Sequence, residues 1–472
     1  MRNIKFTIIL LLGQTITAIA DQRLTVHQAP RPLPVDATTE AWPRFLGLRD
    51  NATSLESGIA TTWTDGGPPL VWEVTKGDGY TTPAIAESRL VLFHRWQDKE
   101  TIECRDPESG ALQWLVDYPI TYRDRYGYSN GPRGSPVING NHVYTFGVTA
   151  RLTCIDLAAG KQLWQRDLKK DYQVPQYFFG SGSSPLVMGD LLVVNAGGGD
   201  APEQDRPTVI AFDKKTGKTR WITKHAWGAS YASPIATTFH GKKRLLIFAG
   251  GKSRPTIGGL MLINPKDGAI IDTFDWRAAK FESVNATTPL VHGNRIFLTE
   301  TYRKGGVALD VGQEPEKFSV AWEAPDLAIH WSMPVYHEGH VYGFHGEREP
   351  FAELVCYDWA TGKCQWRDEM RWTETINGRS MINSPFRGSL LYVANQFLCL
   401  GEGGSLLWLD LSPKGAKTLQ RTQLFNATQT WSTPAIHRGL VYISQHYQDL
   451  RGKTKPRLLC YDFRSATPTT KP

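Results

Sequence analysis

Aromatic, arginine, histidine and amide side chains recur just before short apolar segments along this sequence. Flat rings stack on planar ligands, and a guanidinium group forms paired hydrogen bonds with carboxylates and other anions. The pattern predicts a site for a planar or polyhydroxylated small molecule, or for a protein ligand, although each ring could instead pack only against its neighbours. The predicted ligand-binding cluster comprises Tyr80, Tyr128, Arg133, Trp227, Tyr231, Asn285, His330, Trp331, Arg379, Asn383 and Trp431.

Acidic side chains give a weaker signal for catalysis. The loop acids are Asp124, Asp200, Glu282 and Glu300, and a turn or solvent-facing role accounts for each of them. A glycoside hydrolase would need two carboxylates that face one sugar across its site, and the sequence does not exclude this class. No Cys-x-x-Cys-His haem attachment and no carboxylate cluster with calcium-loop spacing is present, so no metal ligands are predicted.

An internal repeat spaces these residues. Eight times, a Ser or Thr lies one or two positions before a Pro that opens an apolar segment, at intervals of 45 to 55 residues. Each unit continues with short β-rich runs separated by turn residues, which is typical of small antiparallel sheets. The eight prolines are Pro83, Pro136, Pro185, Pro234, Pro289, Pro334, Pro385 and Pro434.

The sharpest element of the repeat is an Asp, a Gly four residues later and a Trp after four more. The Asp side chain caps a turn, the Gly supplies the positive φ of that turn, and the large Trp ring can bury against a neighbouring sheet. Four units carry this spacing, at Asp106, Asp156, Asp213 and Asp358. The predicted docking tryptophans are Trp72, Trp114, Trp164, Trp221 and Trp366.

These units predict an all-β fold, an eight-bladed β-propeller of four-stranded antiparallel blades over residues 42–463. The eighth unit stops at Phe463 without a fourth strand, whereas the segment 70–74 precedes the first unit and carries Trp72. We therefore expect this N-terminal strand to complete the last blade, because closure of the ring removes exposed sheet edges.

The two faces of such a ring differ in loop length. In each four-stranded blade, the connection between the second and third strands shares a face with the link to the next blade. This face receives the longer loops, such as 115–134 and 367–383, whereas the other connections are tight turns. Function tends to reside on longer loops that a rigid scaffold holds. We expect the ligand-binding cluster to surround the propeller axis on this long-loop face.

The Asp-x3-Gly-x3-Trp signature resembles that of the tryptophan-docked quinoprotein alcohol dehydrogenases, and still more their shorter relatives, the PQQ-like β-propeller repeat proteins. The stretch from Gly131–Pro136 through Trp164 and the segment Trp42–Gly47 look typical of the shorter group. The resemblance covers about residues 42–463 and implies the fold more strongly than an activity.

Two functions follow from this resemblance. The first is a binding scaffold for a ligand or protein. The second is an oxidoreductase that acts on alcohols or sugars with pyrroloquinoline quinone and Ca²⁺ on the axis, stacked on a ring and held by Arg and Asn. The dehydrogenases carry an adjacent Cys-Cys pair over the quinone, which this sequence lacks. The scaffold function is therefore preferred.

The N-terminus predicts export. Residues 1–20 combine basic Arg2 and Lys5, an apolar run and the small residues Ala18 and Ala20, in the order of a cleavable signal peptide. Cleavage near Ala20/Asp21 would release a secreted or periplasmic protein, and the apolar run is too short for a stable membrane span. Residues 21–41 are predicted to be a flexible leader, and residues 464–472 a disordered tail.

Charge and cysteine content limit the remaining possibilities. The net charge of +7 falls to +5 without Arg2 and Lys5, which disfavours a nucleic-acid binder. The six cysteines form no Cys-x-x-Cys pair, and four of them occupy one repeat position, so buried packing is favoured over disulfides. We expect a monomer.

Overall fold

The computed structural model describes residues 21–198, 205–250, 257–280, 283–346, 352–376, 379–450 and 453–466. The predicted signal peptide and most of the predicted tail therefore lie outside the described residues. Within the described part of the chain, no helix has the length and apolar character that a bilayer crossing needs. All six cysteines are unpaired; Cys364 is exposed and the other five are buried.

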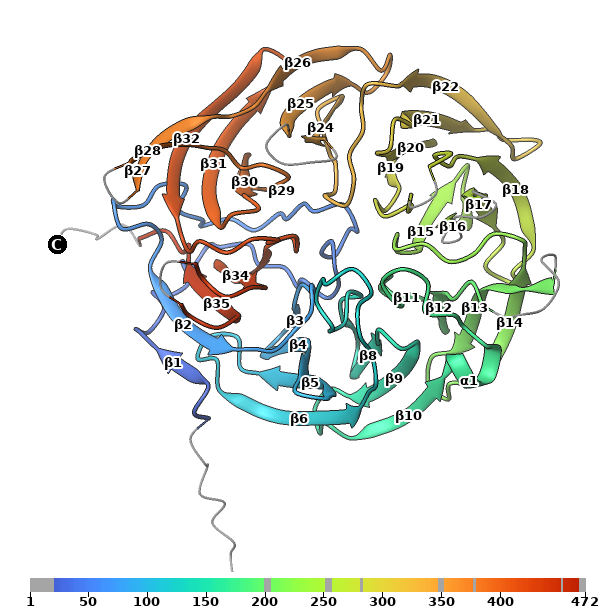
Figure 1. Ribbon diagram of the computed structural model, residues 1–472, viewed down its shortest axis with the longest axis horizontal. Helices are drawn as coiled ribbons and strands as arrows, with labels where there is room; N and C mark the ends of the chain where they lie inside the picture. The colour runs from blue at the N-terminus through green and yellow to red at the C-terminus, as the bar shows by residue number, and fades with distance from the viewer. Residues whose placement is uncertain are drawn as a thin grey trace, which may run out of the picture.

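Eight antiparallel sheets surround a common axis, as the repeat predicted (Figure 1). In every blade the first strand is innermost and short, and the fourth is outermost. The first four blades contain β3 (Ala84–Ala86), β4 (Arg89–Trp96), β5 (Lys99–Arg105) and β6 (Leu112–Pro119); β7 (Val137–Asn139), β8 (His142–Phe146), β9 (Arg151–Asp156) and β10 (Gln162–Asp167); β11 (Leu186–Met188), β12 (Leu191–Asn195), β13 (Pro207–Asp213) and β14 (Thr219–Lys224); and β15 (Ile235–Phe239), β16 (Lys242–Ala249), β17 (Gly259–Ile263) and β18 (Ile270–Asp275).

The remaining blades follow the same order. They contain β19 (Leu290–His292), β20 (Arg295–Glu300), β21 (Gly305–Val311) and β22 (Phe318–Ala324); β23 (Val335–His337), β24 (His340–His345), β25 (Glu353–Asp358) and β26 (Cys364–Asp368); β29 (Ser389–Val393), β30 (Gln396–Leu400), β31 (Ser405–Ser412) and β32 (Gly415–Gln423); and β33 (Ala435–His437), β34 (Leu440–Gln445), β35 (Arg457–Asp462) and β2 (Leu70–Thr75). Two links carry extra elements, the helix α1 (Leu168–Tyr172) and the hairpin β27 (Trp372–Ile376) with β28 (Arg379–Asn383).

The ring closes with strands from both ends of the chain. Strand β2 pairs antiparallel with β35, and Trp72 lies opposite Cys460 in the register, which confirms the predicted closure. A fifth strand, β1 (Leu24–Val26), extends the same sheet by pairing with β2. The chain just before β1 is held by an ion pair, because the Asp21 carboxylate lies 2.6 Å from the guanidinium of the fully buried Arg105. Within residues 21–41, which were predicted to be a flexible leader, Leu24–Val26 thus form a strand of this sheet.

The tryptophans join successive blades. Each indole N–H donates to a carbonyl oxygen in the turn between the third and fourth strands of the next blade. In five of these six junctions the indole ring also packs against a Gly of that turn; at the sixth, a Cβ added at Gly415 would have no neighbour within 4 Å. The bonds are Trp72 to Pro107 (3.0 Å), Trp114 to Leu157 (2.8 Å), Trp164 to Lys214 (3.1 Å), Trp221 to Pro265 (3.0 Å), Trp322 to Trp359 (2.9 Å) and Trp366 to Ser412 (2.7 Å). Trp322 was missing from the predicted set because a longer turn separates it from Asp310.

A second set of hydrogen bonds lies near the axis and joins the first five blades. The Ser or Thr of the repeat donates its backbone N–H to the hydroxyl oxygen of the equivalent residue in the next blade. This belt runs from Thr82 to Ser135 (3.0 Å), Ser135 to Ser184 (2.9 Å), Ser184 to Ser233 (3.0 Å) and Ser233 to Thr288 (3.1 Å). The Ser/Thr-Pro motif therefore links neighbouring inner strands that share no sheet hydrogen bonds.

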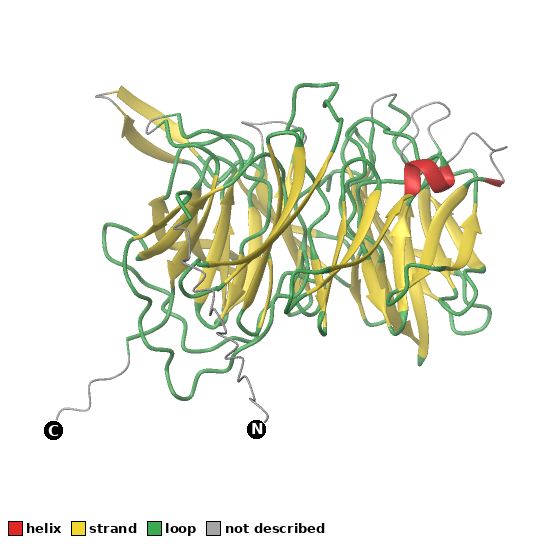
Figure 2. Cartoon of the chain, turned by 90° about the horizontal axis from the view of Figure 1, so that it is seen from below, coloured by secondary structure: helices red, strands yellow, loops and turns green. Residues whose placement is uncertain are grey.

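Residues 28–67, named here the strap, lie across the face opposite the long loops. Arg31 donates to the Asp462 carboxylate at 2.9 Å, and Trp42 exchanges backbone hydrogen bonds with Ile85 in the first blade. The Pro43 carbonyl accepts from the backbone N–H of Ile138 in the second blade. In Figure 2, α1 and the β27–β28 hairpin project from one face, whereas the long loops of the strap lie at the other.

The tryptophan contact predicts the effect of a methyl group at Gly160. This residue has φ of +65°, and an added Cβ would approach the Trp114 ring to 2.5 Å. Gly140 in the same blade has φ of +56° but no neighbour within 4 Å, so Gly140→Ala is a matched control for backbone strain. We expect Gly160→Ala to lower the free energy of unfolding in urea by about 1–3 kcal/mol more than Gly140→Ala. Equal losses would contradict the docking role.

Candidate functional site

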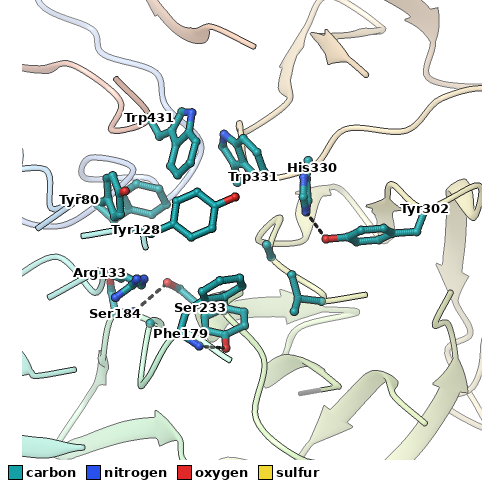
Figure 3. A pocket seen from close by; sticks show the side chains of 15 residues that line it. Tyr80, Tyr128, Arg133, Phe179, Ser184, Ser233, Tyr302, His330, Trp331 and Trp431 are labelled. Carbon is teal, nitrogen blue, oxygen red and sulfur yellow. Dashed lines mark hydrogen bonds between the residues drawn. The ribbon is translucent and has the colours of Figure 1, made fainter. Parts of the chain in front are cut away.

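A cavity of about 230 Å³ lies at the propeller axis, on the long-loop face (Figure 3). The segments that enter the inner strands supply most of its lining, because the inner strands converge on the axis. We name this cavity the cup. It is lined by Phe45, Tyr80, Tyr128, Arg133, Phe179, Gly182, Ser184, Tyr231, Ser233, Val284, Ala286, Tyr302, His330, Trp331 and Trp431.

Seven of the eleven residues in the predicted cluster line the cup, and four lie elsewhere. Trp227 is buried in the core between the third and fourth blades. Asn285 is fully buried and donates to the backbone oxygen of Ala249 at 2.7 Å, so it fixes the chain between two lining residues. Arg379 and Asn383 belong to β28, in a hairpin at the rim of the propeller (Figure 1).

Aromatic rings form two facing parts of the cup wall (Figure 3). On one side, the Trp331 and Trp431 rings lie with their centroids 4.5 Å apart, and Tyr80 packs on Trp431 at 5.1 Å. On the other side, the Phe179 and Tyr231 centroids are 5.4 Å apart. Tyr128 bridges the two sides, at 5.8 Å from Trp431 and 5.6 Å from Phe179. These tilted and edge-on pairs are favourable ring geometries.

Arg133 is the one arginine in the cup lining, and its charge is compensated. Its guanidinium forms an ion pair of 2.8 Å with Asp124, whose side chain is completely buried. Asp124 also accepts the backbone N–H groups of Tyr126 and Tyr128. The carboxylate is therefore a loop-organising group, and it holds Arg133 over the rings of Tyr80 and Phe179.

A second ion pair supports the tryptophan wall. Glu402 accepts from Arg387 at 2.6 Å and from the Trp431 indole N–H at 2.6 Å. The Arg387 guanidinium lies 4.4 Å from the centre of the Trp331 ring. This pair was not predicted from the sequence, since neither residue lies just before the Pro that opens an inner strand.

His330 and Tyr302 form the third side of the cup. The Tyr302 hydroxyl and the His330 Nε2 atom are 2.9 Å apart, within hydrogen-bonding distance. Burial, assisted by the nearby charges of Arg387 and Lys280, lowers the pKa of His330 to about 3, so its ring is neutral at neutral pH. Tyr302 was not predicted because it follows the second strand of its blade.

The floor comes from the strap. Phe45 reaches the cup from the opposite face, and its neighbour Leu46 packs in the core of the sixth and seventh blades. The segment Trp42–Gly47 was singled out in the sequence for its resemblance alone. Because this segment lies outside the repeats, their spacing did not predict that it approaches the axis.

Asp124 and Glu300, the two candidate catalytic acids that the structure describes, do not form a carboxylate pair in the cup. Asp124 is bound to Arg133, and Glu300 lies behind Tyr302 with its carboxylate accepting the Ala278 backbone N–H at 2.8 Å. Asp200 and Glu282 lie outside the described residues. Among the residues that the structure describes, no group of three or more His, Cys, Asp or Glu side chains is arranged to hold a metal ion.

Comparisons with known proteins agree with this fold. The chain matches the PQQ_2 family, described as outer membrane protein assembly factor BamB, over residues 98–368 and 262–471. It is 26% identical over 278 residues to outer membrane protein assembly factor BamB of Moranella endobia (strain PCIT). That alignment covers 49% of this chain and 62% of the relative. The chain thus spans less than two thirds of this curated relative.

Solved structures of two kinds share the architecture. A europium-containing methanol dehydrogenase superposes with a TM-score of 0.63 at 10% identity, covering 90% of this chain and 98% of that chain. Quinohemoprotein alcohol dehydrogenase from Comamonas testosteroni gives 0.62 at 12% identity, covering 92% and 82%. BamB from Moraxella catarrhalis gives 0.55 at 12% identity, covering 84% and 98%. At these identities the likeness establishes the fold alone.

The buried Glu300 predicts a pH dependence of stability. Burial raises the pKa of this carboxyl to about 7, above the usual value near 4.5. The folded state therefore binds more protons than the unfolded state between these values, so stability falls as the pH rises from about 4.5 to 7. In urea unfolding, the unsubstituted protein should lose on the order of 2 kcal/mol of unfolding free energy between pH 5 and pH 8, and Glu300→Gln should not show this loss. The exposed Glu323→Gln is the control, and an unchanged pH profile in both variants would contradict the prediction.

Proposed function

The chain belongs to the PQQ_2 family of outer membrane protein assembly factor BamB, and we propose that it is a non-catalytic docking propeller. It binds a partner protein through its long-loop face, outside the cytoplasm, in the assembly of outer membrane proteins. The observation that carries this proposal is the aromatic cup at the propeller axis, which we call the hub, on that face. A rigid ring that holds such a site at the centre of its longest loops supports protein recognition.

Exposed apolar side chains farther from the axis on the long-loop face support the same function. Met381 and Ile382 on the β28 strand are about half and two-thirds exposed, and Leu450 in the loop before β35 is three-quarters exposed. Large apolar side chains at the centre of an interface supply much of its binding free energy. The hub cluster of Tyr80, Tyr128, Arg133, Tyr231, His330, Trp331 and Trp431 is proposed as the centre of this docking surface.

The residues of the cup do not fit pyrroloquinoline quinone with Ca²⁺. An anionic quinone needs uncompensated cations, and a calcium ion needs several oxygen ligands. The charge of Arg133 is already compensated by Asp124, and that of Arg387 by Glu402. Among the described residues that line the cup, none carries a carboxylate. The oxidoreductase alternative is therefore supported by the fold and not by the residues of the cup.

Site-specific photo-crosslinking in bacterial cells tests the docking face. A photoreactive residue at Met381 or Leu450 should form adducts with outer membrane proteins or their assembly partners. The same residue at Leu48 or Leu55, which are exposed on the strap at the opposite face, should not. These four positions are matched for exposure and apolar character. Adducts that form equally from both faces, or from the strap alone, would refute the docking face.

A cofactor titration tests the alternative. We expect the protein, mixed with micromolar pyrroloquinoline quinone and Ca²⁺, to show no saturable change in quinone absorbance and no dye reduction with alcohols or sugars. Saturable binding that Arg133→Gln abolishes would overturn the non-catalytic function.

A further inference from the structure

We propose that the cup receives a single aromatic side chain of the partner protein, and that Phe45 on the strap sets how deep that ring can enter. This inference rests on the proposed docking function and identifies the group that the hub recognises. It follows from the wall, the floor and the polar groups of the cup, taken in turn.

The wall favours a ring over an aliphatic side chain. Eight of the fifteen lining residues are Phe, Tyr or Trp. Within this wall, neighbouring centroids lie 4.5 to 5.8 Å apart at tilted or edge-on angles. Such spacing is that of stable aromatic pairs, so a further ring between the Trp431 side and the Phe179 side would gain edge and face contacts together. An aliphatic side chain gains only its burial.

The floor excludes a polypeptide that threads through the hub. The strap holds Phe45 at the end of the cup that faces away from the long loops. On one side of Phe45, Trp42 bonds to Ile85. On the other side, the Ala52 carbonyl accepts the backbone N–H of Tyr392, and the Ser54 backbone N–H donates to the Tyr392 carbonyl. The strap is thus fixed to the first and seventh blades, on either side of Phe45. An occupant therefore enters from the long-loop face and stops at the Phe45 ring.

The polar groups of the cup favour an uncharged occupant that can accept hydrogen bonds from the hydroxyl groups of Ser184 and Ser233. The Ser184 oxygen accepts the backbone N–H of Ser135, and the Ser233 oxygen accepts that of Ser184. Each hydroxyl can then donate its own proton to a carbonyl oxygen, such as those of a peptide that flanks the ring. The charge of Arg133 is compensated by Asp124, and the described lining residues include no carboxylate, so a charged side chain of either sign would find no free partner in the cup. Phe, Tyr and Trp remain.

Ligand-observed NMR on the purified full chain tests this inference without a partner protein. The probes are the N-acetyl amides of Phe, Trp and Leu, which present one side chain between two peptide groups. We expect the Phe and Trp amides to bind at least fivefold more tightly than the Leu amide. A Leu amide that binds as tightly as the ring amides would overturn the proposal.

Two substitutions locate the binding. Tyr128→Ala should weaken the ring amides at least threefold, because Tyr128 bridges the two sides of the wall. Tyr126→Ala is the matched control, since Tyr126 is an exposed neighbour that does not line the cup. Phe45→Ala deepens the cup and should shift the preference toward the Trp amide. Equal effects of the two tyrosine substitutions, or an unchanged Phe-to-Trp preference in Phe45→Ala, would overturn it.

The two proposals fail separately. Crosslinks from Met381 and Leu450 without ring-amide binding would retain the docking face and refute the aromatic cup. Ring-amide binding without any crosslink from that face would refute the claim that the occupant is a side chain of a partner protein. The cup would then bind a free aromatic compound.

Discussion

The contact between each outer-strand tryptophan and the turn of the next blade fixes the geometry of the ring. The indole N–H donates to a turn carbonyl at 2.7 to 3.1 Å in six of the blade junctions. The ring can lie on the turn because a Gly without a Cβ atom stands beneath it at Gly110, Gly160, Gly217, Gly268 and Gly362. The fourth blade carries Asp272 at this position, and its carboxylate accepts the Phe318 backbone N–H at 2.7 Å. Every such contact sets one angle between blades, and the sum of the angles decides whether the ring closes.

The arrangement of the blades in this ring determines the shape of the hub. The hydroxyl belt joins the inner strands of the first five blades, so the segments that precede those strands converge at fixed distances from the axis. Rings on these segments then form the wall of the cup, and the strap supplies its floor from the opposite face. Such a site needs no flexible lid, because the blades around the axis and the strap beneath it hold the side chains of the cup in place.

Charge placement separates this hub from a site for an anionic cofactor. Arg133 and Arg387 are held against the aromatic wall by Asp124 and Glu402, so both guanidinium groups serve as neutralised supports. His330 is neutral because burial and neighbouring cations oppose its protonation. The same fold serves dehydrogenases, and recognition therefore depends on the side chains at the hub and not on the architecture.

The sequence by itself determined the eight blades, the closure by the N-terminal strand and most docking tryptophans, because these depend on spacings of a few residues that recur along the chain. Seven of the residues that it indicated line the cup, since each precedes an inner strand and must approach the axis. Tertiary structure alone decided the rest. Phe45 reaches the cup only because the strap crosses the opposite face, and Glu402 supports Trp431 through contacts between segments remote in sequence. Arg379 and Asn383 were expected at the hub, but an inserted hairpin carries them to the rim. Such placements result from packing between distant segments, which local spacing does not encode.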